Sequence, residues 1–390
     1  MLKNPKESFS PIDGGPTRRF LSASAGKHPD QLTFRLAIGL ALVAWLPLAV
    51  MSIAEGVAWG NRVSMPFFAD IASYTRFLIA IPLLIIGESV IGPRLAEVAR
   101  HFLSEGRIGA ADIPLYERAV MSGIRMRESI WGEFIILLIT YASAACFLLI
   151  LAPGVSNWRF STEDGQIVRN SAAWWYALVS VPLFQFLVYR WVYRLFIWAL
   201  FLFRVSRLDL KLMPTHPDKA GGIGFIGAGQ RYLWIISLAL GAALSGTWAN
   251  SILYEGAHIG ELRTTIVCIM VAVVLVLQFP VIFFAGNLRR TRRRGLFIYG
   301  DLALVYSTKF HDKWIEGNNP EGEQLLGSGD IQSLADLGNS FQMIERMWTI
   351  PFDLTACMRL AGAFALPLIP LLLTVMPLDE IIQTLLKMVS

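Results

Sequence analysis

Long apolar runs dominate the chain, and a polar stretch separates each run from the next. A bilayer core about 30 Å thick is crossed by roughly 20 apolar residues in an α-helix. The runs that reach this length are 34–54, 71–91, 130–152, 173–203, 232–253, 266–285 and 354–376. The pattern therefore predicts an all-α, polytopic membrane helix bundle with about seven transmembrane helices.

The composition agrees with a chain that faces lipid. Hydrophobic residues make up 55% of it and charged residues 16%, with a mean hydropathy of +0.53. Soluble proteins average about 25% charged residues. Cys146, Cys268 and Cys357 all lie in apolar runs, so they indicate no disulfide framework. The first apolar run begins too late for an ordinary signal peptide, and we expect it to stay in the mature protein.

Lysine and arginine concentrate in every second loop, and "LRRTRRR" near residue 290 is the densest basic run. The positive-inside rule then places the N-terminus in the cytoplasm and the short C-terminal tail outside. The predicted regions are a partly disordered cytoplasmic segment 1–33, a six-helix region 34–286 with cytoplasmic loops 92–129 and 204–231, a cytoplasmic helical loop 287–353, and a seventh helix with its external tail, 354–390. The net charge of +5 fits loops that face an anionic leaflet, and we expect no nucleic-acid partner.

Two cytoplasmic stretches have amphipathic helical spacing. "GPRLAEVARHFLSEG" predicts a helix that begins at Pro93 and stops at Gly106. "GDIQSLADLGNSFQMIERMW" predicts a second helix with Asp330 as its N-cap. Such helices can lie on the membrane surface. We favour the interpretation that they pack on their own protein.

The loop "PTHPDKAGGIGFIGAGQRY" contains the spacing G-x-G-x-x-G at residues 222–227. A dinucleotide site needs that spacing within a βαβ unit. Here the glycines lie between two membrane helices, so we expect no nicotinamide or flavin cofactor. The His-Pro-Asp tripeptide at 216–218 also matches J-domain co-chaperones, but no soluble helical hairpin surrounds it.

Three further interpretations of this loop stay open. His216 and Asp218 are candidate metal ligands, although the chain has no H-x-x-x-H or C-x-x-C spacing and we predict no metal site. Gly221, Gly222 and Gly224 can form a backbone nest that binds an anion. A plain flexible hinge is the third interpretation.

Charged residues inside the predicted spans form the second candidate site. An ionisable group at membrane depth costs roughly 2.5 to 3.5 kcal/mol, so it is normally paired or lines a wet cavity. By the predicted orientation, five such groups fall near the inner face: Glu88, Glu133, Arg190, Arg194 and Arg359. They are either snorkelling side chains with structural ion pairs or one coupled cluster around a polar vestibule, joined to the glycine loop below it.

The segments "HPDKAGGIGF" and "LLGSGDIQSLADLGNSF" together resemble a group of bacterial polytopic inner-membrane proteins that have no assigned activity. The resemblance implies a location in the bacterial inner (cytoplasmic) membrane. It implies no chemistry.

Two functional classes follow from these features. The favoured one is a transporter or channel for a small solute, and the arginines favour an anion. The alternative is a membrane-embedded enzyme at the cytoplasmic interface, with His216 as acid or base and Asp218 as its partner. A non-catalytic assembly or signalling partner is also compatible with the sequence. The expected partners are the lipid bilayer and the solute, and homo-oligomerisation is left open.

Overall fold

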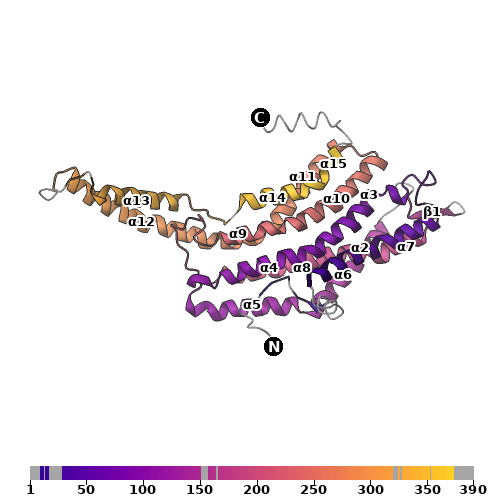
Figure 1. Cartoon of the computed structure of the whole chain (residues 1–390), viewed down its shortest axis with the longest axis horizontal. Helices are drawn as coiled ribbons and strands as arrows, with labels where there is room; N and C mark the ends of the chain where they lie inside the picture. The colour runs from indigo at the N-terminus through magenta and orange to yellow at the C-terminus, as the bar shows by residue number, and fades with distance from the viewer. Residues whose placement is uncertain are drawn as a thin grey trace.

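A computed structural model shows a helical bundle whose long helices run side by side (Figure 1). It describes residues 9–12, 14–16, 29–150, 157–163, 166–318, 324–325, 327–351 and 353–372. Six helices in this part of the chain are long and apolar enough to cross a membrane, or seven if the bent pair Ala110–Arg127 and Ile130–Cys146 counts as one span. The predicted all-α polytopic bundle is confirmed.

The helices and strands, in chain order, have the following bounds. The first part contains α2 (Pro29–Ala54), η2 (Phe67–Ala69), α3 (Ile71–Ser73), the π-helix η3 (Tyr74–Ala80), α4 (Ile81–His101), η4 (Ser104–Gly106), η5 (Ala110–Asp112), α5 (Ile113–Arg127) and α6 (Ile130–Ile150). The middle part contains β1 (Phe160–Glu163), β2 (Gln166–Arg169), α7 (Ser171–Trp175), the π-helix η6 (Tyr176–Ser180) and α8 (Val181–Val205). The last part contains α9 (Phe225–Gln230), η7 (Arg231–Leu233), α10 (Trp234–Tyr254), α11 (Ile259–Gln278), η8 (Phe279–Phe284), α12 (Ala285–Trp314), α13 (Gly329–Glu345), α14 (Leu354–Ala365), η9 (Leu366–Leu368) and α15 (Ile369–Leu372).

The predicted spans agree with these helices, with two differences at their ends. The third and seventh predicted spans end at residues 152 and 376, which lie outside the described residues. The predicted helix start at Pro93 is wrong, because Pro93 lies inside α4, which continues to His101. An antiparallel pair formed by β1 and β2 was not predicted and lies in the loop after α6.

Two spans contain a π-helical stretch just before a proline. Tyr74–Ala80 precedes Pro82, and Tyr176–Ser180 precedes Pro182. Proline has no N–H and its ring crowds the carbonyl four residues earlier, so a local π-turn accommodates it without breaking the helix. The two stretches touch, because Arg76 Nη1 donates to the Tyr176 hydroxyl at 2.7 Å.

Helix α10 packs against α14, α4 and the α3–η3 segment. Small residues permit this packing: a Cβ at Gly241 would lie 2.3 Å from the carbonyl oxygen of Phe364, and one at Gly246 would lie 2.0 Å from Thr75 Oγ1. Small residues at helix contacts are typical of membrane bundles.

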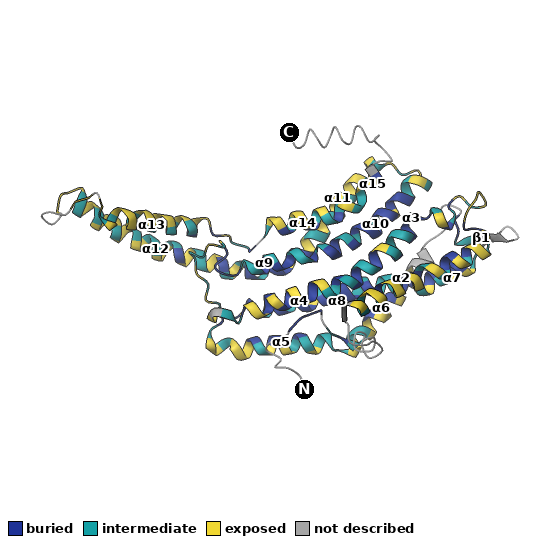
Figure 2. Cartoon of the chain, in the orientation of Figure 1, coloured by how far each residue is buried: buried dark blue, intermediate teal, exposed yellow. Residues whose placement is uncertain are grey.

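The outward faces of several spans are apolar and exposed (Figure 2). Phe34 on α2, Leu138 on α6 and Val276 on α11 are 58%, 62% and 66% exposed. Continuous apolar surface of this kind is unusual on a soluble monomer. It fits contact with lipid.

The α12–α13 hairpin projects beyond the other helices, at the end of the bundle away from β1 and β2 (Figure 1). Asp330 accepts hydrogen bonds from Lys313 Nζ at 3.0 Å and Trp314 Nε1 at 2.9 Å. Asp330 therefore joins the two helices. It is not the N-cap as predicted, because Ser328 occupies that position. Helix α13 packs on its own protein, as we favoured.

The predicted orientation can be tested by single cysteines at the two ends. Ser64 is exposed in the loop between α2 and α3, and Ser333 is exposed on α13. In a background without the native cysteines, we expect a membrane-impermeant maleimide to label Ser64→Cys in right-side-out vesicles, and Ser333→Cys only after the membrane is opened. Labelling of both variants from one side would contradict the predicted topology.

Candidate functional site

One face of α8 brings two arginines into the bundle. The residues Leu187, Arg190, Trp191, Arg194, Ile197, Trp198 and Phe201 are all buried. They recur every three or four residues, which places them on one stripe of the helix. Arg190 and Arg194 are therefore carried inward by the same periodicity that buries their apolar neighbours.

Glu88 on α4 joins the two arginines. Its Oε1 lies 3.1 Å from Arg190 Nη1 and 2.7 Å from Arg194 Nη1. The three side chains are only 12%, 9% and 4% exposed. Ion pairs this deeply buried are weakly screened by solvent, so breaking one is costly.

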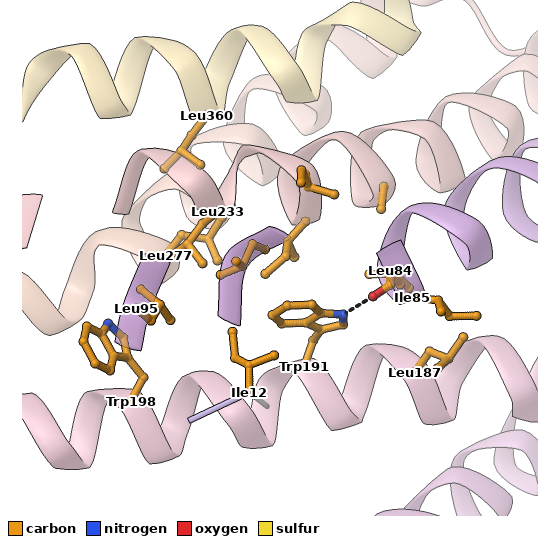
Figure 3. Packing of buried hydrophobic residues seen from close by; sticks show 14 of the residues in the cluster. Ile12, Leu84, Ile85, Leu95, Leu187, Trp191, Trp198, Leu233, Leu277 and Leu360 are labelled. Carbon is orange, nitrogen blue, oxygen red and sulfur yellow. Dashed lines mark hydrogen bonds between the residues drawn. The ribbon is translucent and has the colours of Figure 1, made fainter. Parts of the chain in front are cut away.

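The neighbouring turn of α4 fits closely against the same helix. Trp191 Nε1 donates to the carbonyl oxygen of Leu84 at 2.8 Å (Figure 3). A Cβ at Gly87 would lie 3.2 Å from the Trp191 ring, so the absence of a side chain at this position makes room for the indole. The contact holds α4 and α8 in the register that aligns Glu88 with the arginines.

Glu133 on α6 is the fourth member of the cluster. Its Oε1 lies 4.0 Å from Arg190 Nε, at the outer limit of an ion pair. Arg190 Nη2 is buried and has no hydrogen-bond partner among the described residues. The predicted cluster thus exists for Glu88, Glu133, Arg190 and Arg194, and Arg190 retains one unused donor.

The helices also indicate how deep the cluster lies. Arg190 is 19 residues from the start of the span Ser171–Val205, or about 29 Å along an α-helix. Glu88 is 17 residues from the start of the span Ile71–His101, or about 26 Å. Both distances place the cluster near the end of the bilayer core that we predict to be cytoplasmic.

Arg359 does not belong to this cluster. Its side chain is exposed on α14, a helix that packs on α10 and α11. The rotation of α14 turns this residue outward, where a long side chain can reach the interface.

The glycine loop is also separate from the cluster. It packs against the end of α4, where the Phe225 ring lies 5.1 Å from the Phe102 ring, and against Leu288 of α12. Its polar contacts are with the segment before α14: Trp348 N donates to Lys219 O at 2.8 Å, and Arg231 pairs with Asp353 at 2.5 Å. Within the described chain no ion pair joins the loop to Glu88, Arg190 or Arg194. The expected coupling between loop and cluster is therefore absent from the described contacts.

The N-terminal segment contributes to the site in a way that sequence reasoning missed. Phe9, Ser10 and Ile12 are 3%, 1% and 1% exposed. The Phe9 ring lies 4.9 Å from the Phe201 ring, and Ile12 belongs to the same buried cluster as Trp191 and Trp198 (Figure 3). The two apolar residues in "ESFSPIDGG" were the available signal, but they are too few to indicate burial on their own.

Polar contacts fix this segment in place. Ser10 Oγ donates to Gly92 O at 3.1 Å, and Arg127 Nη1 donates to Ser10 O at 2.7 Å. Gly15 N donates to Glu128 Oε1 at 3.2 Å. The segment therefore runs between α4, α5 and α8, against the turns of α8 that follow the charged cluster.

Asp218 organises the glycine loop. Its Oδ1 accepts from Ala220 N at 2.9 Å and Gly222 N at 3.1 Å, and its Oδ2 accepts from Gly224 N at 2.9 Å. Burial opposes its ionisation, but these backbone donors, with a hydrogen bond to His216, outweigh it and lower the pKa of the Asp218 carboxyl. Gly222 and Gly224 thus donate to an anion, as the nest interpretation expected, but that anion is the chain's own carboxylate.

The loop glycines have structural reasons for their positions. Gly221 and Gly222 have φ of +65° and +93°, which other residues rarely adopt. A Cβ at Gly227 would lie 2.7 Å from Pro351 O. His216 Nδ1 lies 2.8 Å from Asp218 Oδ1, and its side chain is 40% exposed. The predicted residues His216, Asp218, Gly221, Gly222 and Gly224 thus form one compact unit.

His216 and Asp218 have no third candidate metal ligand near them. No group of three or more His, Cys, Asp or Glu residues with metal-binding geometry occurs in the part of the chain that the structure describes.

Comparison of the chain with protein-family models, curated proteins and solved structures found no match.

The buried ion pair leads to a stability prediction. We expect Glu88→Gln to destabilise the protein by about 3 to 5 kcal/mol, because it leaves two buried guanidinium groups without their shared carboxylate. Arg194→Gln should cost less, because Glu88 still pairs with Arg190. The double variant should lose less than the sum of the two. Thermal unfolding in detergent measures this cycle. The matched control is the exposed pair Arg94–Glu97, 50% and 63% exposed, where changes should stay below about 1 kcal/mol. Additive losses at Glu88 and Arg194 would contradict the pairing.

The Asp218 carboxylate leads to a pH prediction. Because its pKa is lowered in the folded protein, its contribution to stability is present at neutral pH. That contribution is lost as the pH falls below about 4 and through the folded pKa. We expect Asp218→Asn to lower stability at pH 7 by roughly 1 to 3 kcal/mol, and the gap to the wild type to narrow in acid. Melting curves across pH measure it, with exposed Asp301→Asn as control. A gap that is constant with pH would refute the assignment.

Proposed function

We propose that the protein binds a small anionic solute inside the bundle and carries it across the bacterial inner membrane. The observation that most supports this is Arg190, whose Nη2 is buried and lacks a hydrogen-bond acceptor in the described chain. A guanidinium group presents five N–H donors in a planar fork that matches carboxylate and phosphate oxygens. An anionic solute supplies the acceptor that the neighbouring side chains leave out.

The sharing of Glu88 favours the same class of solute. Two guanidinium groups bind a single oxygen of Glu88, and Glu133 reaches Arg190 only at 4.0 Å. Two arginines and two carboxylates have no net formal charge, so the unused Arg190 donor favours an anion and an excess of positive charge does not. In a poorly solvated interior the hydrogen bond from that donor to an anion is stronger than in water.

The N-terminal segment is the proposed gate on the cytoplasmic side. Phe9 contacts Phe201 of α8, about three turns after Arg190 toward the predicted cytoplasmic end, and Ile12 belongs to the same buried cluster. Phe9, Ile12 and a few hydrogen bonds hold it. Elements with few contacts open at low free-energy cost compared with whole helices. This structure then represents a state closed toward the cytoplasm.

The π-helical stretches support movement on the other side of the cluster. Tyr74–Ala80 and Tyr176–Ser180 interrupt the regular hydrogen bonding of the spans that carry Glu88 and Arg190. Such interruptions are frequent at functional sites and allow adjacent turns to shift. The two spans can therefore adjust without separating their buried ion pairs.

An enzyme at His216 is supported less well. A general base needs a free acceptor and a partner that orients it. Asp218 already accepts three backbone hydrogen bonds in addition to its contact with His216. The carboxylate is engaged in holding the loop, so we favour transport.

Anion flux into proteoliposomes tests the proposal. Chloride, phosphate, sulfate and acetate are suitable probes, read as currents on a solid-supported membrane. We expect at least one of them to give a saturable current that falls about tenfold or more in Arg190→Lys, which keeps the charge but loses the fork. Arg118→Lys on the exposed face of α5 is the control and should match the wild type.

Opening the proposed gate should raise the rate of anion transport, whereas Arg190→Lys should lower it. A Cβ at Gly123 would lie 2.8 Å from the Phe9 ring, so Gly123→Ala should expel Phe9 while leaving α5 helical. We expect faster anion uptake in this variant and in Phe9→Ala. If neither the wild type nor these variants carries any of the four anions, the transport proposal is wrong.

A further inference from the structure

A second cationic site lies at the predicted cytoplasmic end of the bundle. A cleft of about 1130 Å³ separates the segment 207–214, after α8, from the first turns of α12. Five of its lining residues are cationic: Arg207, Lys211, Arg290, Arg293 and Arg294. The basic run that we used only to orient the chain therefore forms one wall of a cleft, which we call the basic cleft.

Helical spacing explains which arginines face the basic cleft. Asn287, Arg290 and Arg294 follow each other at intervals of three and four residues on α12, and all three line it. Arg292 turns to the other side and donates to Glu345 O at 2.8 Å. The walls meet at Gly295, where a Cβ would lie 2.7 Å from Pro214.

The charge of the basic cleft is strongly unbalanced. Its only acidic lining residue is Asp209, against five cations. Among the ion pairs described for this chain, none involves Arg207, Lys211, Arg290, Arg293 or Arg294. Like charges gathered around one recess repel each other, and a bound anion relieves that repulsion. A smaller cavity of about 310 Å³ adjoins it and shares Arg207 and Arg290.

The position of the basic cleft relates it to the membrane surface. Helix α12 begins where the apolar α11–η8 span ends, and Phe279 and Ile282 just before it are 54% and 47% exposed. On the far side Phe297 is 65% exposed. The cations therefore lie between the exposed apolar surface of the span and the α12–α13 hairpin, where the predicted topology places the lipid phosphates.

We propose that the basic cleft binds a phosphate-bearing anion. Arginine forks pair with phosphate oxygens through two parallel hydrogen bonds, and three arginines from α12 meet one arginine and one lysine from the opposite wall. The volume admits a phospholipid headgroup or a small soluble phosphorylated molecule. This site is distinct from the Arg190 cluster and does not depend on transport.

The experiment compares probes on the full-length protein after its lipid has been removed in detergent. The probes are phosphatidylglycerol, zwitterionic phosphatidylcholine and inorganic pyrophosphate, read as shifts in melting temperature and as adducts in native mass spectrometry. We expect phosphatidylglycerol or pyrophosphate to stabilise the wild type, and Arg290→Gln with Arg294→Gln to weaken that binding about tenfold or more. A response to phosphatidylglycerol alone identifies a lipid headgroup, and a response to pyrophosphate identifies a soluble ligand.

The matched control removes the same charge from the same end of the molecule. Arg289 and Arg346 are exposed and lie outside the lining. Arg289→Gln with Arg346→Gln should bind the probe as the wild type does. Equal weakening in both double variants would overturn the proposal in favour of a diffuse positive field. A wild type that responds to none of the probes, or equally to phosphatidylcholine, would also overturn it.

Discussion

Two guanidinium groups held away from water between apolar helices impose the strictest condition on this structure. Arg190 and Arg194 depend on one oxygen of Glu88, so α4 and α8 have to meet at one depth and one rotation. The Trp191–Leu84 hydrogen bond and the small Gly87 secure that register one turn away. Helix α6 then has to approach closely enough for Glu133 to face Arg190. A slip of one turn in any of these helices would leave a charge buried alone.

The same rule, that buried polar groups need partners, accounts for the glycine loop. Its backbone donors converge as an anion site does, yet Asp218 already occupies the position of the anion. The loop is therefore a compact connector. It ties the segment before α9 to the segment between α13 and α14 through the Lys219–Trp348 hydrogen bond. The glycine loop is therefore a weaker candidate for ligand binding than Arg190, which has a donor without a partner in the described chain.

Positive charge serves two purposes in this chain. Basic residues at the ends of spans set the predicted orientation in the membrane. The arginines of α12 also line a cleft, because Gly295 brings the helix against Pro214. In our proposal the cleft adds a defined shape to the general attraction between cations and an anionic surface.

The sequence by itself determined the class of fold and the number and approximate limits of the spans. These properties depend on local periodicity and on the cost of polar groups in lipid, both of which can be read along one chain. It also placed Glu88, Glu133, Arg190 and Arg194 at one depth, because depth along a span is proportional to residue number.

Only the tertiary structure decided which of the charges at that depth meet. Arg359 was predicted at the same depth but does not meet the others, since α14 turns it outward. The burial of Phe9 and Ile12 depends on a socket formed by α4, α5 and α8, with room left by Gly123. Likewise, the basic cleft exists because two segments about 80 residues apart approach each other. The rotation of a helix, the socket for Phe9 and the basic cleft all depend on contacts between distant segments. A local sequence pattern does not predict such contacts.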